Sequence, residues 1–254
     1  MSNLLARIST AAFVTGSAIT TSFFSGNPER SKRTEVYKEQ QKLLDKNLVT
    51  PANLTFAFIW PVIYSGTTAL AIHQGLPSQA NNPRYRKARP WLWACYTLNL
   101  VFAYYFSKNG KGARIGGAVT TIATLPAALG LHQALEIGRT EPSEPERTFR
   151  KAVSLYAGWL TVATVVSGAN LLLDGGYQPA EKAARRWATL ALPATTGLGL
   201  SVARRLHDPY YPVGIGVGLV GIAVKQASRR KNLAVLATAC AVGITGWAVR
   251  KILK

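Results

Sequence analysis

The charged residues of this chain are confined to short stretches that separate long apolar blocks. Lys and Arg occur in clusters such as NPERSKR, RYRKAR, SKNGKGAR, RRKN and VRKILK. A water-soluble helical protein would instead interleave charges every three or four residues along each helix. Blocks almost free of charge are expected in the interior of a lipid bilayer, because burying a charged side chain there costs free energy. The pattern therefore predicts a protein that lies within a membrane.

The apolar blocks have the length of membrane-spanning helices. A hydrocarbon core of about 30 Å needs roughly 20 apolar residues per helix. A weak block covers residues 4–25, which are rich in Ser and Thr and include Arg7. Seven stronger blocks cover approximately residues 52–76, 90–107, 113–137, 151–173, 187–206, 211–227 and 232–251. Arg89-Pro90 is expected to begin the helix of block 90–107. We therefore predict an all-α, polytopic transmembrane helix bundle.

Two segments near the start of the chain leave alternatives open. Residues 4–25 are either a retained helix or a targeting segment, since they carry one positive charge and no acidic residue. Residues 26–50 form a long polar segment, which is either a disordered loop or contains a short amphipathic helix on the membrane surface, marked by Leu43, Leu44 and Leu48. Lys and Arg divide almost equally between the two sides of an eight-helix arrangement, so the sequence does not predict its orientation.

The net charge of +19 raises the question of a nucleic-acid partner. The basic residues punctuate the chain evenly rather than forming one face or tail, which argues against nucleic-acid binding. Anionic lipid head groups explain the charge more simply, because each Lys or Arg near a membrane surface contributes roughly 1 kcal/mol. We therefore expect the lipid bilayer, and no nucleic acid, as the partner of the basic segments.

Residues that could perform chemistry are sparse. His132 and Glu136 are four residues apart, but no third ligand accompanies them, so no metal site is expected. No acidic pair falls within an apolar block, which argues against a proton pump or an ion-coupled transporter. In the stretch GIGVGLVG, Gly214, Gly218 and Gly221 share one helical face, which predicts close approach of a neighbouring helix rather than a dinucleotide site. We expect no catalytic residues and no required cofactor.

What remains inside the blocks is a set of aromatic residues at helical spacing. Phe56, Trp60 and Tyr64 share one face of a helix, and Tyr156 and Trp159 share a face of another. A flat-walled apolar pocket between such helices could hold a planar ligand by stacking, with an Asn or Tyr side chain fixing its orientation. From spacing alone, however, packing between helices is the favoured interpretation.

The first of these faces resembles a motif of the tryptophan-rich sensory protein, or translocator protein (TspO/MBR), family. The second helix of that family begins with a pattern of the type Pro-Pro-x-Trp-x-Phe-Gly-x-x-Trp-x-x-x-Tyr. The positions that fit its spacing are Pro51, Phe56, Trp60 and Tyr64. The positions that depart from it are Leu54 for the first Trp, Ala57 for Gly, and Thr50 or Ala52 for one Pro.

Two further helices resemble motifs of the same family. The third helix of the family carries Asn-x-x-Trp-Ser-x-x-x-Phe, which is similar to Asn99, Phe102 in place of Trp, and Phe106. The fifth carries Pro-Tyr-x-x-Trp-x-x-x-Ala-Thr-x-x-Asn, which is similar to LYAGWLTVATVVS here. Its matching positions are Tyr156, Trp159, Ala163 and Thr164, whereas Leu155 replaces Pro and Ser167 replaces Asn. The chain looks most like the longer, cyanobacterial-type members.

The resemblance implies a domain organisation and a class of ligand. Residues 1–173 would form the five-helix unit of the family, with residues 26–50 as its long first loop, and residues 174–254 would add about three transmembrane helices. The family pocket binds tetrapyrroles such as protoporphyrin or haem, and sterols in some members. The residues expected to line it here are Phe56, Trp60, Tyr64, Asn99, Phe102, Tyr156, Trp159 and Ala163.

The resemblance also suggests three candidate functions for the protein. The leading hypothesis is a protein that binds a hydrophobic planar molecule for sensing, handling or transport, in a bacterial or thylakoid-type membrane rather than a mitochondrial one. The second is a structural or assembly subunit, as a homodimer or within a larger membrane complex, because several tryptophans of the motifs are missing. An enzyme that degrades tetrapyrroles is a third and minor possibility.

Overall fold

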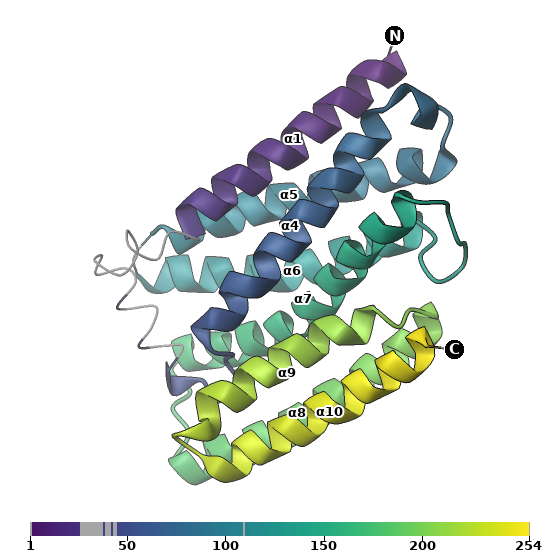
Figure 1. Cartoon of the computed structure of the whole chain (residues 1–254). Coiled ribbons are helices and arrows are strands. Elements are labelled where there is room, and N and C mark those ends of the chain that lie inside the picture. Colours follow the sequence, from purple (N-terminus) through teal and green to yellow (C-terminus); the bar gives the residue numbers. More distant parts are fainter. Residues whose placement is uncertain (1, 26–37, 39–41, 43–44, 109, 254) are drawn as a thin grey trace.

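The computed structural model describes residues 2–25, 38, 42, 45–108 and 110–253, which are almost entirely helical and contain no strand (Figure 1). The helices of these residues are α1 (Ser2–Ser25), α4 (Asn53–Gly75), the short 3-10 helix η1 (Pro77–Gln79), α5 (Pro83–Phe106), α6 (Lys111–Ala134), α7 (Glu146–Asp174), α8 (Glu181–Leu206), α9 (Tyr211–Ala227) and α10 (Lys231–Ile252). The predicted all-α bundle is confirmed.

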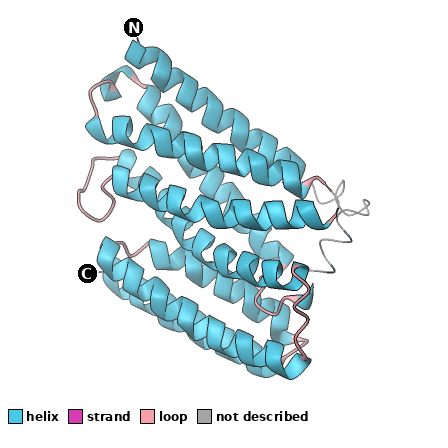
Figure 2. Ribbon diagram, turned by 180° about the vertical axis from the view of Figure 1, so that it is seen from behind, coloured by secondary structure: helices cyan, strands magenta, loops and turns pink. Residues whose placement is uncertain are grey.

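The long helices lie side by side and run alternately in opposite directions, so that the connections gather at the two ends of the bundle. Figures 1 and 2 show α1 at one edge and α8 with α10 at the opposite edge. Between these edges, α7 packs against α4, α6 and α9, while α9 also packs against α10. Helices α7 and α9 therefore form the middle of the bundle.

The outer surface of the bundle is strongly apolar, as a lipid environment requires. On α10, Val235, Val242 and Val249 are exposed at a spacing of seven residues, and α4 exposes Phe58 and Val62. By length and apolar content alone, four of the described helices can cross a membrane, namely α4, α6, α7 and α10, while α9 is apolar but shorter. These features support an integral, multi-pass membrane protein.

Helix α5 begins earlier than Pro90, so the predicted start at Arg89-Pro90 is wrong. The Asn82 side chain caps the helix by accepting a hydrogen bond from the backbone N–H of Arg84 at 3.1 Å, and Pro83 occupies the first helical position. Both residue types are favoured there, since Asn satisfies an unpaired N–H and Pro has none to lose. Pro90 lies within α5.

The predictions for the long polar segment 26–50 fall largely outside the described residues, including Leu43 and Leu44. Leu48 is described, and it is buried in a turn rather than lying on the surface of a membrane. Its carbonyl oxygen accepts a hydrogen bond from the Gln226 amide of α9 at 2.9 Å. The end of this segment is therefore fastened to the bundle.

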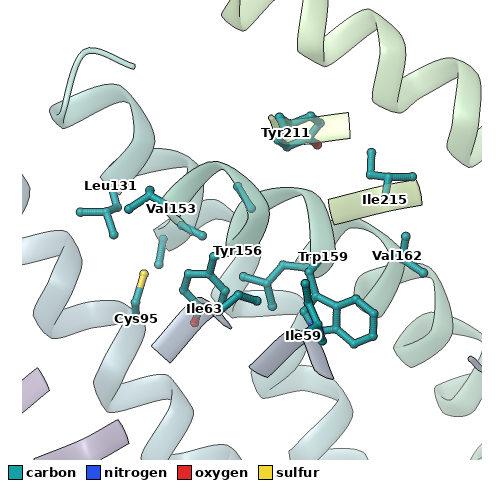
Figure 3. Packing of buried hydrophobic residues seen from close by; sticks show 14 of the residues in the cluster. Ile59, Ile63, Cys95, Leu131, Val153, Tyr156, Trp159, Val162, Tyr211 and Ile215 are labelled. Atoms are coloured by element: carbon teal, nitrogen blue, oxygen red, sulfur yellow. The ribbon is translucent and has the colours of Figure 1, made fainter. Parts of the chain in front are cut away.

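The glycine face predicted in α9 is confirmed as a surface of close helix approach. A Cβ atom added at Gly214 would lie 2.7 Å from the backbone nitrogen of Trp159, and one at Gly218 would lie 2.9 Å from the Val162 side chain. At Gly221, the carbonyl oxygen accepts a hydrogen bond of 2.9 Å from the backbone N–H of Ala52, which precedes α4. Buried side chains of α4, α7 and α9 form one hydrophobic core (Figure 3).

Helix α1 is held to the bundle by specific side-chain contacts. Arg7 is only 5% exposed and donates a hydrogen bond of 2.6 Å from Nη1 to the carbonyl oxygen of Leu76, at the end of α4. The Phe13 ring stacks on Trp93 with centroids 4.0 Å apart, and the Trp93 indole donates to Thr10 at 3.0 Å. These contacts fasten α1 to α4 and α5.

Replacing Arg7 by methionine is expected to lower the thermal unfolding midpoint of the detergent-solubilised protein. The substitution keeps the length of the side chain but removes the charged donor from the carbonyl oxygens of Gly75 and Leu76, which should cost about 1–3 kcal/mol. Leu5→Met on the exposed face of the same helix is the control. Equal midpoints for both variants would contradict a docking role for Arg7.

Candidate functional site

Five of the predicted site residues meet in the interior, between α4 and α7. Trp60 stacks on Tyr64 with ring centroids 5.1 Å apart, and it makes edge contacts with Tyr156 at 6.0 Å and Trp159 at 6.4 Å. Phe56 makes an edge contact with Trp159 at 5.2 Å. We call Phe56, Trp60, Tyr64, Tyr156 and Trp159 the aromatic cluster. It brings together residues that lie about a hundred positions apart in the chain.

The local helical geometry explains this gathering. The three aromatic residues of α4 are spaced by four, and the two of α7 are spaced by three, so each set projects from one face of its helix. Figure 3 shows Tyr156 and Trp159 of α7 next to Ile59 and Ile63 of α4, which belong to the same core. The isoleucines thus pack in the same core beside the aromatic rings.

Asn99 of α5 supplies the polar part of the site. Its Oδ1 accepts a hydrogen bond of 2.9 Å from the Tyr156 hydroxyl, and both side chains are buried. The Asn99 amide nitrogen Nδ2 and the Trp159 indole nitrogen Nε1 are also buried, and neither has a hydrogen-bond partner within the described part of the chain. Each is an N–H donor without an acceptor, which costs free energy unless another group supplies one.

The aromatic cluster is more open on its α4 side than on its α7 side. Tyr156 and Trp159 are 0% and 1% exposed, whereas Phe56 and Trp60 are only half-buried. An aromatic side chain in such a position can present one face to a ligand without first leaving the core. Trp60 occupies the centre of the contacts, so a planar molecule entering the cluster would have to displace Trp60 or stack on it.

Two predicted residues lie apart from the aromatic cluster. Phe102 stacks on Phe106 with centroids 5.6 Å apart, and a Cβ atom added at Gly117 of α6 would lie 3.9 Å from the Phe102 ring. Phe102 therefore faces α6. Ala163 is half-buried and lies one turn beyond Trp159 on α7.

Tyr96 is a neighbour of the site that sequence reasoning missed. Its ring lies 6.2 Å from that of Tyr64, and its hydroxyl forms a hydrogen bond with Thr67 of α4. The available signal was its position three residues before Asn99, which puts the two on one face of α5. Tyr96 extends the aromatic wall toward α5.

An apolar pocket of about 90 Å³ lies outside the aromatic cluster. It is formed by the end of α7, the start of α8 and residues 46–49. The aromatic side chains that line it are Tyr177 and Trp187. None of the eight predicted site residues contributes to this pocket.

An all-helical bundle with apolar outer faces and several helices long enough to cross a bilayer defines a multi-pass integral membrane protein. Residues 7–250 match the family model described as TSPO-like protein. The chain therefore belongs to the TSPO-like family. The match continues past residue 173 into the last three helices, and the division of the chain at that residue stays a prediction. No curated protein and no solved structure matches the chain.

Proposed function

We propose that the protein binds a hydrophobic, planar molecule of the tetrapyrrole type within the aromatic cluster, for sensing, handling or transport rather than for catalysis. One observation carries the proposal: the Asn99 and Trp159 N–H groups are buried among aromatic rings and have no acceptor among the described residues. A ligand with carbonyl or carboxylate oxygens would satisfy both donors. Its flat apolar body would stack on the rings of Trp60 and Phe56.

The chemistry of these residues also sets which tetrapyrrole makes the best probe. The aromatic cluster offers indole and phenol groups and the neighbouring Asn99 offers an amide, but the phenolic oxygen of Tyr156 is already bonded to Asn99. Protoporphyrin needs no axial ligand, so its binding depends on stacking and hydrogen bonding alone. It is therefore a simpler probe than haem.

Protoporphyrin is expected to bind the purified protein saturably, and Trp60→Ala is expected to weaken binding about tenfold. The loss combines aromatic stacking, about 0.5–1.5 kcal/mol, with buried apolar area. Trp159→Phe keeps an aromatic ring but removes the Nε1 donor, which should weaken binding about fivefold, the equivalent of one hydrogen bond. The measurement is the absorbance change of the porphyrin, which does not depend on how many tryptophans remain.

Trp187→Phe on α8 is the matched control, because Trp187 is 41% exposed and lies outside the aromatic cluster. It should leave the porphyrin titration unchanged. Non-saturable binding, or the same affinity in the Trp60→Ala, Trp159→Phe and Trp187→Phe variants, would reject this site. Porphyrin consumption with a defined product would instead indicate an enzyme that degrades tetrapyrroles.

A structural or assembly role is the second candidate, and the packing of the aromatic cluster favours it. The rings of Trp60, Tyr64, Tyr156 and Trp159 already contact one another, as they would in a core with no ligand. In that case the protein should purify from mild detergent with other membrane proteins or as a homodimer. A monodisperse monomer that binds protoporphyrin would support the ligand-binding function.

A further inference from the structure

Three arginines meet at one end of the bundle, where α1 passes the start of α5. Arg89 donates a hydrogen bond of 3.1 Å from Nη2 to the Asn3 side chain of α1. Arg7 lies one turn after Asn3 on α1, and Arg86 lies one turn before Arg89 on the same face of α5. We call Arg7, Arg86 and Arg89 the arginine cluster.

Within the part of the chain that the structure describes, the arginine cluster has no acidic partner, unlike Arg84 and Lys87 at the start of α5. Arg84 forms an ion pair of 3.1 Å with Glu146, and Lys87 forms one of 3.3 Å with Glu136. Within the described residues, no carboxylate forms an ion pair with any of the three members of the arginine cluster. The two faces of α5 are therefore charged differently, one neutralised within the chain and one left positive.

Burial makes the positive charge of Arg7 costly, whereas Arg89 is half-buried and Arg86 is exposed. Arg7 is 5% exposed, and its only acceptors among the described residues are the carbonyl oxygens of Gly75 and Leu76. The carbonyls at a helix end offer about half an elementary charge, which does not neutralise the Arg7 guanidinium group. The Nε atoms of Arg7 and Arg89 are both buried without a partner in this part of the chain. An external anion would satisfy these donors and the charge together.

The surroundings indicate where such an anion would come from. Leu4, Leu5 and Ile8 are exposed on α1 beside the arginine cluster, and α5 exposes Trp91 and Trp93 directly after it. Tryptophan is enriched at the boundary between the hydrocarbon core and the head groups of a bilayer. The arginine cluster thus lies at the expected depth of lipid head groups, next to exposed apolar side chains of α1 and α5.

We propose that the arginine cluster binds the phosphate of an anionic phospholipid, whose acyl chains lie against the exposed apolar faces of α1 and α5. Guanidinium groups suit this role because their planar N–H donors match phosphate oxygens in pairs. The bound lipid would neutralise the junction of α1, α4 and α5 and so stabilise the docking of α1. This site is separate from the aromatic cluster and does not depend on the proposed function.

The test uses the full-length protein, stripped of lipid in a zwitterionic detergent and titrated with phosphatidylglycerol or phosphatidylcholine. Phosphatidylglycerol is expected to raise the thermal unfolding midpoint and to remain bound in native mass spectrometry, whereas phosphatidylcholine should do neither. Arg86→Gln should weaken phosphatidylglycerol binding about fivefold, the value of one basic residue at a membrane surface. Lys87→Gln removes the same charge from the adjacent position and should leave binding unchanged, because Lys87 already has Glu136.

A second substitution keeps the proposal testable if charge removal alone affects folding. Arg86→Glu places a carboxylate beside Arg89, so it should raise the unfolding midpoint without lipid and abolish the effect of phosphatidylglycerol. Equal effects of Arg86→Gln and Lys87→Gln on lipid binding would overturn the proposal. So would inorganic phosphate or an acidic peptide that raises the midpoint as much as phosphatidylglycerol does.

Discussion

Gly158→Ala is expected to disrupt the bundle by forcing α7 away from α9. A Cβ atom at Gly158 would overlap the carbonyl oxygen of Tyr211 and lie 3.3 Å from the Cα of Gly214. Both contacts are with backbone, which cannot rotate away as a side chain could. We expect a loss of about 3 kcal/mol or more, at the upper end of overpacking effects. The measurements are the thermal unfolding midpoint and the size-exclusion profile in mild detergent.

Gly168→Ala is the matched control on the same helix, because a Cβ atom at Gly168 would have nothing within 4 Å. Alanine favours helix by about 1 kcal/mol over glycine, so this control should be neutral or slightly stabilising. If Gly158→Ala and Gly168→Ala unfolded at the same temperature, the close approach of α7 and α9 would be refuted.

Glu146→Gln is expected to have the second large effect on stability. Glu146 is buried at the start of α7 and accepts hydrogen bonds from Arg84 at 3.1 Å and from Arg150 at 2.6 Å. Arg150 is itself only 3% exposed, so the substitution leaves a buried guanidinium without its counter-charge. Breaking such a pair costs about 3–5 kcal/mol. The thermal unfolding midpoint should therefore fall sharply.

Glu181→Gln at the start of α8 provides the comparison. Glu181 also pairs with an arginine four residues later, Arg185, at 2.7 Å, but both side chains are more than half exposed. Exposed pairs contribute little to stability, so the midpoint should hardly change. Similar losses in Glu146→Gln and Glu181→Gln would mean that burial of the first pair is not what stabilises the bundle.

The sequence was sufficient for the architecture, because apolar blocks without charge have few interpretations. Its main error concerned α5, whose first turns contain Arg84, Arg86, Lys87 and Arg89. A helix end this rich in charge resembles a loop when only hydropathy is considered. The structure shows that Glu146 and Glu136 pair with two of these residues, and both acids are more than forty positions away along the chain. Such partners have no local signature.

The candidate site was predictable only in part, for a similar reason. Spacing along α4 and α7 identifies the faces of Trp60 and Trp159, but contact between them depends on how two helices pack. His132 illustrates the limit, since the sequence paired it with Glu136 four residues later. The residue Glu136 lies beyond the end of α6 with φ of 56°, so helical spacing does not apply to it. The partner of His132 is Asp208, at 2.8 Å and 76 residues away.

The central position of α9 has a consequence for the order in which the protein is made. Helices α1 to α7 leave the ribosome first, yet the Gly158 surface of α7 and the backbone N–H of Ala52 both find their partners on α9. Until residues 211–227 have been synthesised and inserted, α7 has a surface shaped for a helix that does not yet exist. The packing of α7 and of the residues that precede α4 is therefore completed only after α9 has been inserted.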